Sequence, residues 1–237
     1  PIVVPALPAS VYTRLLQTEI DAHDAHTVIL SCEALFTPAF DEASLERIKS
    51  SLEFARIKIL AVLRDQATML ESAFAQRVTG PQRFAGTAKE HFDMAEERGV
   101  FDYEQRLSEF EAVFDRDQLH VAWYEEIHED ILKPIRDISR IDENRAYSNP
   151  SYDNRRASWL FIFLVRKINL FNLNEQNRRV AIGTIRRIDT ILVKLGFQKR
   201  LDKLFSPYAE TSKQELRDRH FDANKRIGEK YSVRLGS

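Results

Sequence analysis

The stretch KILAVLRDQATMLESAFAQRV, Lys58 to Val78, decides the fold. It begins with an apolar run, Ile59–Leu63, that has the length and composition of a buried strand. From Asp65 onward the apolar residues have helical spacing. The apolar side chains on one face of this predicted helix are Met69, Leu70, Ala73, Phe74 and Val78. Arg64 stands between the two segments, and Ser72 lies eight residues beyond it. Because helix amino termini and the carboxyl edges of parallel sheets both favour anions, we predict an anion site at Arg64.

The composition is that of an ordinary globular protein. The 237 residues are 43% hydrophobic and 30% charged, with 35 basic and 36 acidic side chains and a net charge of -1. We therefore predict no nucleic-acid partner and expect any anion site to be a local cluster. The longest apolar run, Trp159 to Val165, is far shorter than the roughly 20 residues of a membrane span, so we predict no membrane span.

The single cysteine, Cys32, excludes an intramolecular disulfide and a paired-cysteine metal motif. A reducing, cytoplasmic setting fits such a chain, and no amino-terminal signal segment is visible. Cys32 is interpreted as a small core residue that ends a second predicted strand, Thr27–Cys32. Glu33 follows, and a carboxylate at the end of a buried strand suits a general base. The residues alone slightly favour the alternative, a glutamate that caps a helix or bonds a loop.

The rest of the chain alternates helical patterns with one more strand, Leu119–Tyr124 (LHVAWY). Helices are predicted over residues 10–22, 42–55, 65–78, 101–114, 152–170, 175–195 and 212–231, with one more beginning after Glu129. Residues 79–99 are turn-rich and polar and are predicted to be irregular. The predicted buried stripe of the helix over residues 101–114 is Tyr103, Leu107, Phe110 and Phe114, and that of the helix over residues 175–195 is Ala181, Ile185, Ile188, Leu192 and Leu195. These patterns indicate an α/β fold with a parallel sheet flanked by helices and a helix-rich carboxyl half.

The segment R-D-Q-x-x-x-x-E-S-A-F after the central strand resembles the 3′-phosphate-binding segment of sulfotransferases that use 3′-phosphoadenosine 5′-phosphosulfate (PAPS). In that family an arginine and a serine eight positions later hold the 3′-phosphate of the nucleotide. The resemblance implies this role for Arg64 and Ser72. On the residues alone, an arginine that caps a helix or forms an ion pair, with a serine on a helix flank, is an equally good reading.

Three further stretches are similar to the same family. The pattern x-V-x-x-Y-E-[DE]-[LI] implies that Tyr124 packs on the adenine ring, whereas the residues alone favour an aromatic side chain buried between sheet and helix. Ser31-Cys32-Glu33 resembles the S-x-E of bacterial members, which again implies that Glu33 is a base. The ending F-x-x-x-N-K-R-I-x-x-x-Y is interpreted as a packing signature made of Phe221, Asn224, Ile227 and Tyr231. The stretch over residues 145–151 resembles family loops beside the nucleotide, which implies phosphate contacts at Arg145, Asn149 and Ser151, whereas the residues alone favour a plain surface loop.

The resemblance implies one P-loop-type domain over residues 1–237, with PAPS as co-substrate and no metal. The implied reaction moves a sulfuryl group to a hydroxyl or amine of a small-molecule or glycan acceptor, with a carbohydrate expected. The family's loop P-K-x-G-[ST]-[ST], which binds the 5′-phosphosulfate, has no counterpart, since the first glycine is Gly80. Either that amino-terminal portion is absent from this chain, which a start at Pro1 favours, or the protein is a non-catalytic relative that binds nucleotide or acts as a scaffold. A phosphoryl transferase is disfavoured because G-x-x-x-x-G-K-[ST] is missing. The sequence indicates no oligomeric state.

Overall fold

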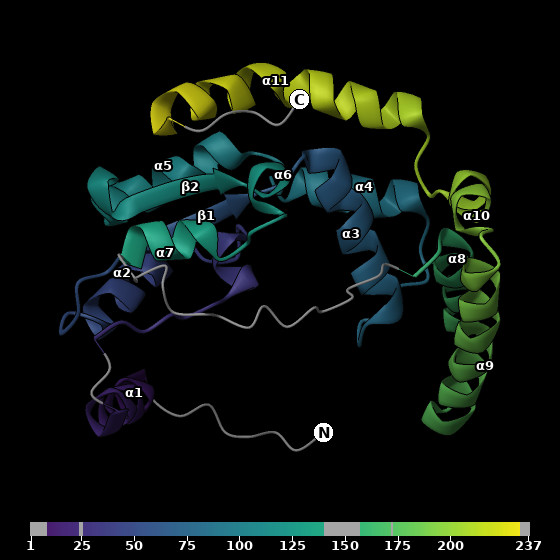
Figure 1. Cartoon of the computed structure of the whole chain (residues 1–237), viewed down its shortest axis with the longest axis horizontal. Coiled ribbons are helices and arrows are strands. Elements are labelled where there is room, and N and C mark those ends of the chain that lie inside the picture. Colours follow the sequence, from purple (N-terminus) through teal and green to yellow (C-terminus); the bar gives the residue numbers. More distant parts are fainter. Residues whose placement is uncertain (1–8, 24–25, 140–156, 172, 233–237) are drawn as a thin grey trace. The chain divides into compact units, whose positions relative to one another are not determined.

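The computed structural model describes residues 9–23, 26–139, 157–171 and 173–232 (Figure 1). The chain divides into two compact units. The first unit comprises Pro1–Leu63, Asp102–Arg145 and Ala223–Ser237, and the second comprises Arg64–Phe101 and Ala146–Asp222. Helices dominate both units. The strands found in the described residues form one two-stranded sheet in the first unit.

The sheet of the first unit is a parallel pair, β1 (Ile59–Leu63) and β2 (Leu119–Trp123), which lie side by side (Figure 1). Ile59 is paired with Leu119, and Leu63 with Trp123, so both strands end at the same edge. Parallel neighbours need a long connection, and the chain between these strands contains several helices. Two of the three predicted strands, Ile59–Leu63 and Leu119–Tyr124, are therefore confirmed, as is a parallel pairing within an α/β fold.

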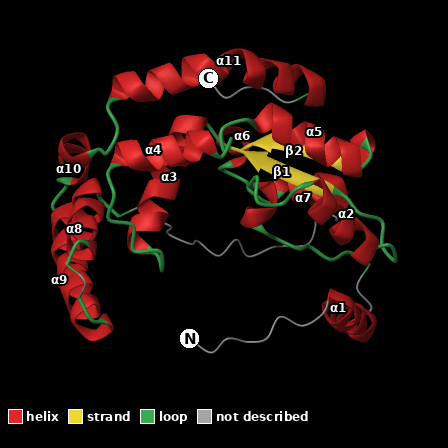
Figure 2. Ribbon diagram, turned by 180° about the vertical axis from the view of Figure 1, so that it is seen from behind, coloured by secondary structure: helices red, strands yellow, loops and turns green. Residues whose placement is uncertain are grey.

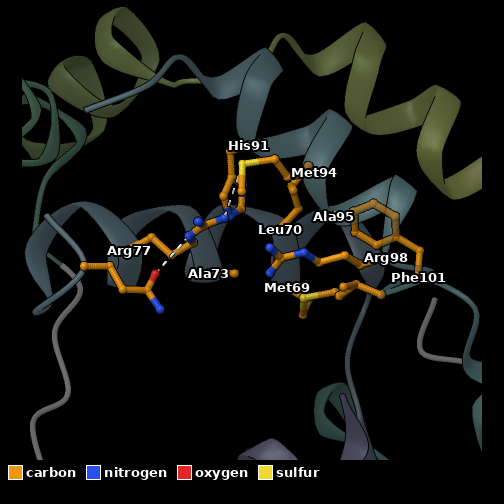
Figure 3. A pocket seen from close by; sticks show the side chains of 11 residues that line it. Met69, Leu70, Ala73, Arg77, His91, Met94, Ala95, Arg98 and Phe101 are labelled. Carbon is orange, nitrogen blue, oxygen red and sulfur yellow. Dashed lines mark hydrogen bonds between the residues drawn. The ribbon is translucent and has the colours of Figure 1, made fainter. Parts of the chain in front are cut away.

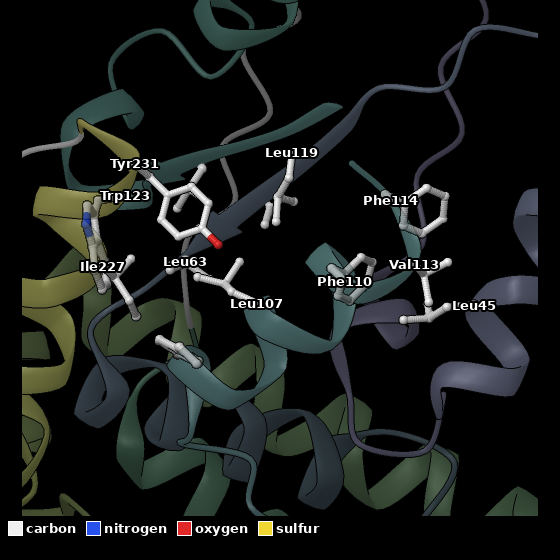
Figure 4. Packing of buried hydrophobic residues seen from close by; sticks show 13 residues of the cluster. Leu45, Leu63, Leu107, Phe110, Val113, Phe114, Leu119, Trp123, Ile227 and Tyr231 are labelled. Atoms are coloured by element: carbon white, nitrogen blue, oxygen red, sulfur yellow. The ribbon is translucent and has the colours of Figure 1, made fainter. Parts of the chain in front are cut away.

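The core of the first unit lies on this sheet (Figure 4). Helix α5 (Tyr103–Val113) supplies its apolar face, which matches the predicted stripe. The buried side chains of this core come from five elements or their ends and include Leu45, Leu63, Leu107, Phe110, Phe114, Trp123, Ile227 and Tyr231. Leu45 belongs to α2 (Glu42–Ser51), and the last two belong to α11 (Glu210–Tyr231). The Tyr231 hydroxyl donates to Glu111 Oε1 at 2.8 Å and so fixes the end of α11.

The predicted strand Thr27–Cys32 is wrong, because the structure gives these residues no strand pairing. The side chains of Val28, Ile29 and Leu30 are 43%, 58% and 60% exposed, and Cys32 is exposed instead of buried in a core. A strand needs a neighbour for its backbone groups, and an apolar run cannot show that one is at hand. The remaining short elements of this unit are α1 (Ala9–His23), η1 (Glu33–Phe36), η2 (Arg116–Gln118), α6 (Tyr124–Ile127) and α7 (Lys133–Ser139).

All regular elements in the described residues of the second unit are helices. It contains α3 (Gln66–Thr79), α4 (Ala88–Glu97), α8 (Trp159–Asn169), α9 (Glu175–Lys194), α10 (Gln198–Phe205) and the first half of α11. Its core joins α3 and α8 through side chains that include Leu70, Phe74, Val78, Trp159, Phe161 and Val165. Helices α8 and α9 run side by side (Figure 2). Ser158 caps α8 and donates from its hydroxyl to the buried Asp189 of α9, while Asp202 of α10 accepts from the Trp159 backbone N–H at 2.8 Å.

Two parts of the second unit differ from the prediction. Helix α4 lies in the stretch predicted to be irregular, and it begins with a capping box between Thr87 and Glu90. On α9 the predicted burial of Ile188 and Leu195 is wrong, since they are 50% and 65% exposed. The predicted loop contacts Arg145, Asn149 and Ser151 lie outside the described residues. Over the part of the chain that the structure describes, no helix is long and apolar enough to cross a bilayer.

Candidate functional site

The predicted phosphate segment lies in the second unit, where the chain leaves β1 at Leu63 and enters α3. Asp65 caps the helix, since its Oδ1 accepts from the Thr68 backbone N–H at 2.9 Å and from the Thr68 hydroxyl at 2.8 Å. Arg217 also donates to both Asp65 oxygens. The amino terminus of α3 therefore already holds a carboxylate. A further anion at this place has to rely on side chains more than on the free amides of the helix.

The ion pair with Arg217 neutralises the carboxylate beside Arg64. Partial burial raises the pKa of Asp65, but the hydrogen bonds from Arg217 and Thr68 outweigh it and hold this pKa below its ordinary value of 3.8. Asp65 is thus charged at neutral pH and balanced by a guanidinium within hydrogen-bonding distance. An incoming phosphate would meet less repulsion from Asp65 than an unpaired carboxylate would exert.

Ser72 lies in the middle of α3, and both Ser72 and Arg64 are half-buried. The helix rises about 1.5 Å per residue, so Ser72 is roughly 10 Å along the axis from Asp65. Helical side chains lean toward the amino terminus, which turns Ser72 toward the strand end of the helix. Its neighbour Glu71 is 9% exposed and forms an ion pair of 2.7 Å with Lys213 of α11. Their roles in binding phosphate stay predictions.

The other two predicted site residues belong to the first unit. Tyr124 is the residue after Trp123, the last residue of β2, and it begins α6 with a half-buried side chain. Glu33 is the first residue of the short helix η1 and follows no strand. The structural reason for placing a general base at Glu33 is therefore wrong, because the strand that was to present it does not form.

The second unit holds a cavity of about 190 Å³ between α3, α4 and the segment that follows α4 (Figure 3). Most of its wall is apolar and is formed by Met69, Leu70, Ala73, Met94, Ala95, Val100 and Phe101. An engineered cavity of about 150 Å³ admits benzene, so this one suits a ring or a short aliphatic group. It lies in and beside residues 79–99, the stretch that was predicted to be irregular.

Two guanidinium groups give the cavity a positive rim. Arg77 donates from Nε to Gln82 Oε1 at 2.9 Å, and its guanidinium carbon lies 4.8 Å from the centre of the Phe84 ring. Arg98 extends into the cavity beside Met69 (Figure 3), and no described carboxylate pairs with it. Apolar walls with two cations favour a ligand that joins an apolar body to a negative group.

His91 lines the same cavity and is 3% exposed. Its Nδ1 lies 3.0 Å from the Tyr208 hydroxyl, and its ring packs edge-on against Phe74. Burial, helped by the charge of Arg77, lowers the pKa of His91 from 6.5 to about 4. The imidazole is therefore neutral at physiological pH. Burial likewise raises the pKa of Tyr208 above its ordinary value, so this pair forms an uncharged polar contact in the wall.

The cavity residues were missed in the sequence because their signals are weak. Met69, Ala73 and Arg77 follow each other at helical spacing, so an arginine continues an apolar stripe of α3. The T-x-x-E pattern of Thr87 and Glu90 is typical of a capping box and indicates the start of α4, which forms the other wall of the cavity. Among the described residues, no group of three or more histidine, cysteine, aspartate or glutamate side chains is placed to hold a metal ion.

Comparison with known proteins identifies no relative of this chain. No family model matches the chain, no curated protein matches it, and no solved structure matches it.

Proposed function

We propose that this protein is a PAPS-dependent sulfotransferase with a P-loop-type sheet, which binds the 3′-phosphate of the nucleotide at Arg64 and Ser72. The observation that carries the proposal is the parallel pairing of Leu63 with Trp123. Arg64 is the residue after the first of these and Tyr124 the residue after the second. Open parallel sheets bind ligands outside this carboxyl edge, so the pairing supports a nucleotide site where the two strands end.

The proposed chemistry is a direct transfer. A base removes the proton of an acceptor hydroxyl or amine, and the acceptor atom forms a bond to sulfur. The bond between sulfur and the bridging oxygen breaks, and 3′-phosphoadenosine 5′-phosphate leaves with that electron pair. Arg64 and Ser72 position the donor, and Tyr124 orients its adenine. Glu33 stays the predicted base, although no strand presents it.

The cavity lined by Arg77 and Arg98 is the proposed binding region for the acceptor. Its apolar wall and positive rim support an acceptor with an apolar part and a negative group, which a sulfated or uronic-acid sugar attached to an apolar aglycone would provide. A neutral carbohydrate would leave both guanidinium groups of the rim without a negative partner.

Calorimetry with 3′-phosphoadenosine 5′-phosphate and with AMP tests the nucleotide site. We expect the 3′-phosphorylated nucleotide to bind at least about tenfold more tightly, because charge-assisted hydrogen bonds contribute about 1.5–3 kcal/mol. Arg64→Gln and Ser72→Ala should each reduce that preference, and Arg200→Gln, an exposed arginine of α10, should leave it unchanged. If AMP binds equally well, the assignment of Arg64 and Ser72 is wrong.

The second candidate function is a nucleotide-binding or scaffold protein without transferase activity. It is favoured by one observation: no P-K-x-G-[ST]-[ST] element occurs in the 237 residues. The two candidates separate when PAPS labelled with radioactive sulfur is incubated with the protein and a mixture of glycans and phenols. Transfer of label supports the enzyme, whereas nucleotide preference without any transfer supports the second candidate.

A further inference from the structure

The outward side of α9 and α10 exposes an unusual number of large apolar side chains. Six of them lie on these helices or at their ends, Val180, Ile188, Ile191, Leu195, Phe197 and Leu204, and two more, Leu170 and Phe171, follow α8. Their exposed fractions run from 43% for Phe197 to 68% for Leu204. Single exposed apolar residues are ordinary on proteins, but a concentration of this kind marks an interaction surface. We call it the α9–α10 face.

Four of these residues form one stripe along α9. Val180, Ile188, Ile191 and Leu195 recur at multiples of three and four residues, which places them on the same side of the helix. A separate side packs inside the unit through Ile182 and Ile185, and it includes the buried Asp189. The exposed stripe is therefore not the surface that α9 uses to fold. At about 1.5 Å per residue, the stripe from Val180 to Leu195 extends over roughly 22 Å.

The same segment is strongly basic although the chain as a whole is not. Residues 170–204 contain eight basic side chains, Arg178, Arg179, Arg186, Arg187, Lys194, Lys199, Arg200 and Lys203, and three acidic ones, Glu175, Asp189 and Asp202. The local net charge is +5, against -1 for all 237 residues. Asp189 and Asp202 are occupied within the unit by Ser158 and the Trp159 backbone. Two of the three carboxylates therefore point into the unit and away from the face.

Arg187 and Lys194 lie beside the stripe, whereas the guanidinium carbon of Arg186 lies 5.5 Å from the centre of the buried Phe161 ring. Arg186 and Arg187 line a shallow hollow together with Gly183, Thr190 and Ile191 of the same helix. An added Cβ at Gly183 would meet nothing within 4 Å, so the hollow is open there. Among the described residues, neither arginine has a carboxylate partner. An apolar stripe thus borders the Arg187 guanidinium and the Lys194 ammonium group, which suits a phosphate attached to an apolar body.

We propose that the α9–α10 face docks on the surface of an anionic phospholipid bilayer. Aliphatic side chains would enter the boundary between head groups and acyl chains, while Arg187 and Lys194 would contact lipid phosphates. The face is a convex helix side and not a groove, so it matches a broad fluid surface better than a single peptide. The helix would lie on the membrane and not cross it, in agreement with its charge content. This proposal is independent of the sulfotransferase assignment.

Sedimentation of the full chain with sucrose-loaded vesicles tests the proposal. We expect binding to phosphatidylcholine vesicles that contain phosphatidylglycerol, weaker binding to pure phosphatidylcholine, and a loss of binding as salt is raised. Arg187→Gln and Lys194→Gln should each lower the partition coefficient about fivefold, because a basic residue near an anionic surface contributes about that factor. Ile188→Gln combined with Ile191→Gln should lower it about tenfold or more.

The controls use side chains of the same types in the first unit. Phe54→Gln and Arg56→Gln change exposed residues and should leave binding unchanged. All of these positions are exposed, so circular dichroism and the thermal midpoint should match the wild type and exclude misfolding. Equal binding to both kinds of vesicle, or no effect of the α9 variants, overturns the proposal. So does a concentration-dependent dimer in light scattering that the α9 variants dissociate, because a second copy then covers the face. Nucleotide calorimetry on the same variants should be unaffected in every case.

Discussion

Arg217 donates to both carboxylate oxygens of Asp65, from Nε at 3.1 Å and from Nη2 at 3.2 Å. This pair joins α11 to the amino terminus of α3 within the second unit, and Asp65 is also the cap of that helix. One carboxylate therefore has two functions: it satisfies a backbone amide of α3 and neutralises a guanidinium of α11. The residue before it is Arg64, the proposed phosphate contact, so the stability of this junction bears directly on the proposed site.

A double-mutant cycle should separate the two functions of Asp65. Asp65→Asn keeps a capping oxygen and removes the charge, so we expect a loss of about 1 kcal/mol in the free energy of unfolding. Arg217→Gln should cost a similar amount, and the double variant should cost little more than either single one. Asp65→Ala should cost about 1 kcal/mol more because the cap is also lost. Urea denaturation measures all four, and strictly additive losses would show that the pair contributes nothing.

The same pair predicts a dependence on pH. The folded state lowers the pKa of Asp65 below 3.8, so its contribution is complete above the unfolded pKa and is lost as the pH falls through the lower, folded value. The difference in unfolding free energy between the wild type and Asp65→Asn should therefore be constant near neutral pH and shrink in acid below about pH 4. Denaturation midpoints over this range give the answer, and a difference that grows in acid would contradict the sign.

His91 predicts a second, separate acid transition. Because burial lowers its pKa from 6.5 to about 4, the unfolded chain binds a proton more readily than the folded one in this interval. The folded state should lose roughly 2 to 3 kcal/mol as the pH falls from about 6.5 to about 4. His91→Gln keeps a hydrogen-bonding group for Tyr208 without titrating, and it should flatten this part of the profile. NMR titration of the six histidines provides the direct check, and an ordinary pKa at His91 would contradict the prediction.

Two residues of the carboxyl-terminal pattern F-x-x-x-N-K-R-I-x-x-x-Y should differ in their contribution to stability. Ile227 is 2% exposed and Phe221 is 58% exposed, although the sequence interpretation treated both as packing residues. Ile227→Ala should cost about 2 to 4 kcal/mol because it leaves a cavity in the core of the first unit. Phe221→Ala should change the unfolding free energy by no more than about 0.5 kcal/mol. Equal losses in thermal or urea denaturation would mean that Phe221 packs as first interpreted.

The sequence predicts best where local pattern and tertiary packing agree. The apolar run Ile59–Leu63 forms β1 with the predicted bounds, and the stripe of α5 is buried as expected. Thr27–Cys32 has an equally apolar run but forms no strand, since pairing depends on a neighbour far away in the chain. On α9 two apolar stripes share one helix, so periodicity alone could not show which of them faces the core.

The candidate site was predictable only in part for a similar reason. Motif spacing locates Arg64 and Ser72 on one strand–helix unit, and the structure places them there. The cavity depends instead on α4, which was not predicted, meeting α3 so that Arg77, His91 and Arg98 share one hollow. These residues are 21 positions apart at most, but nothing in their spacing shows that two helices bring them together.

The exposure of Cys32 has a practical consequence. It is the one thiol among 237 residues, and it lies on an accessible segment beside the proposed base Glu33. A maleimide fluorophore should therefore attach at a single, known position without any engineered substitution. Such a dye would report by anisotropy or quenching whether nucleotide, acceptor or vesicles alter the surroundings of this segment, and the native chain would supply its own reporter.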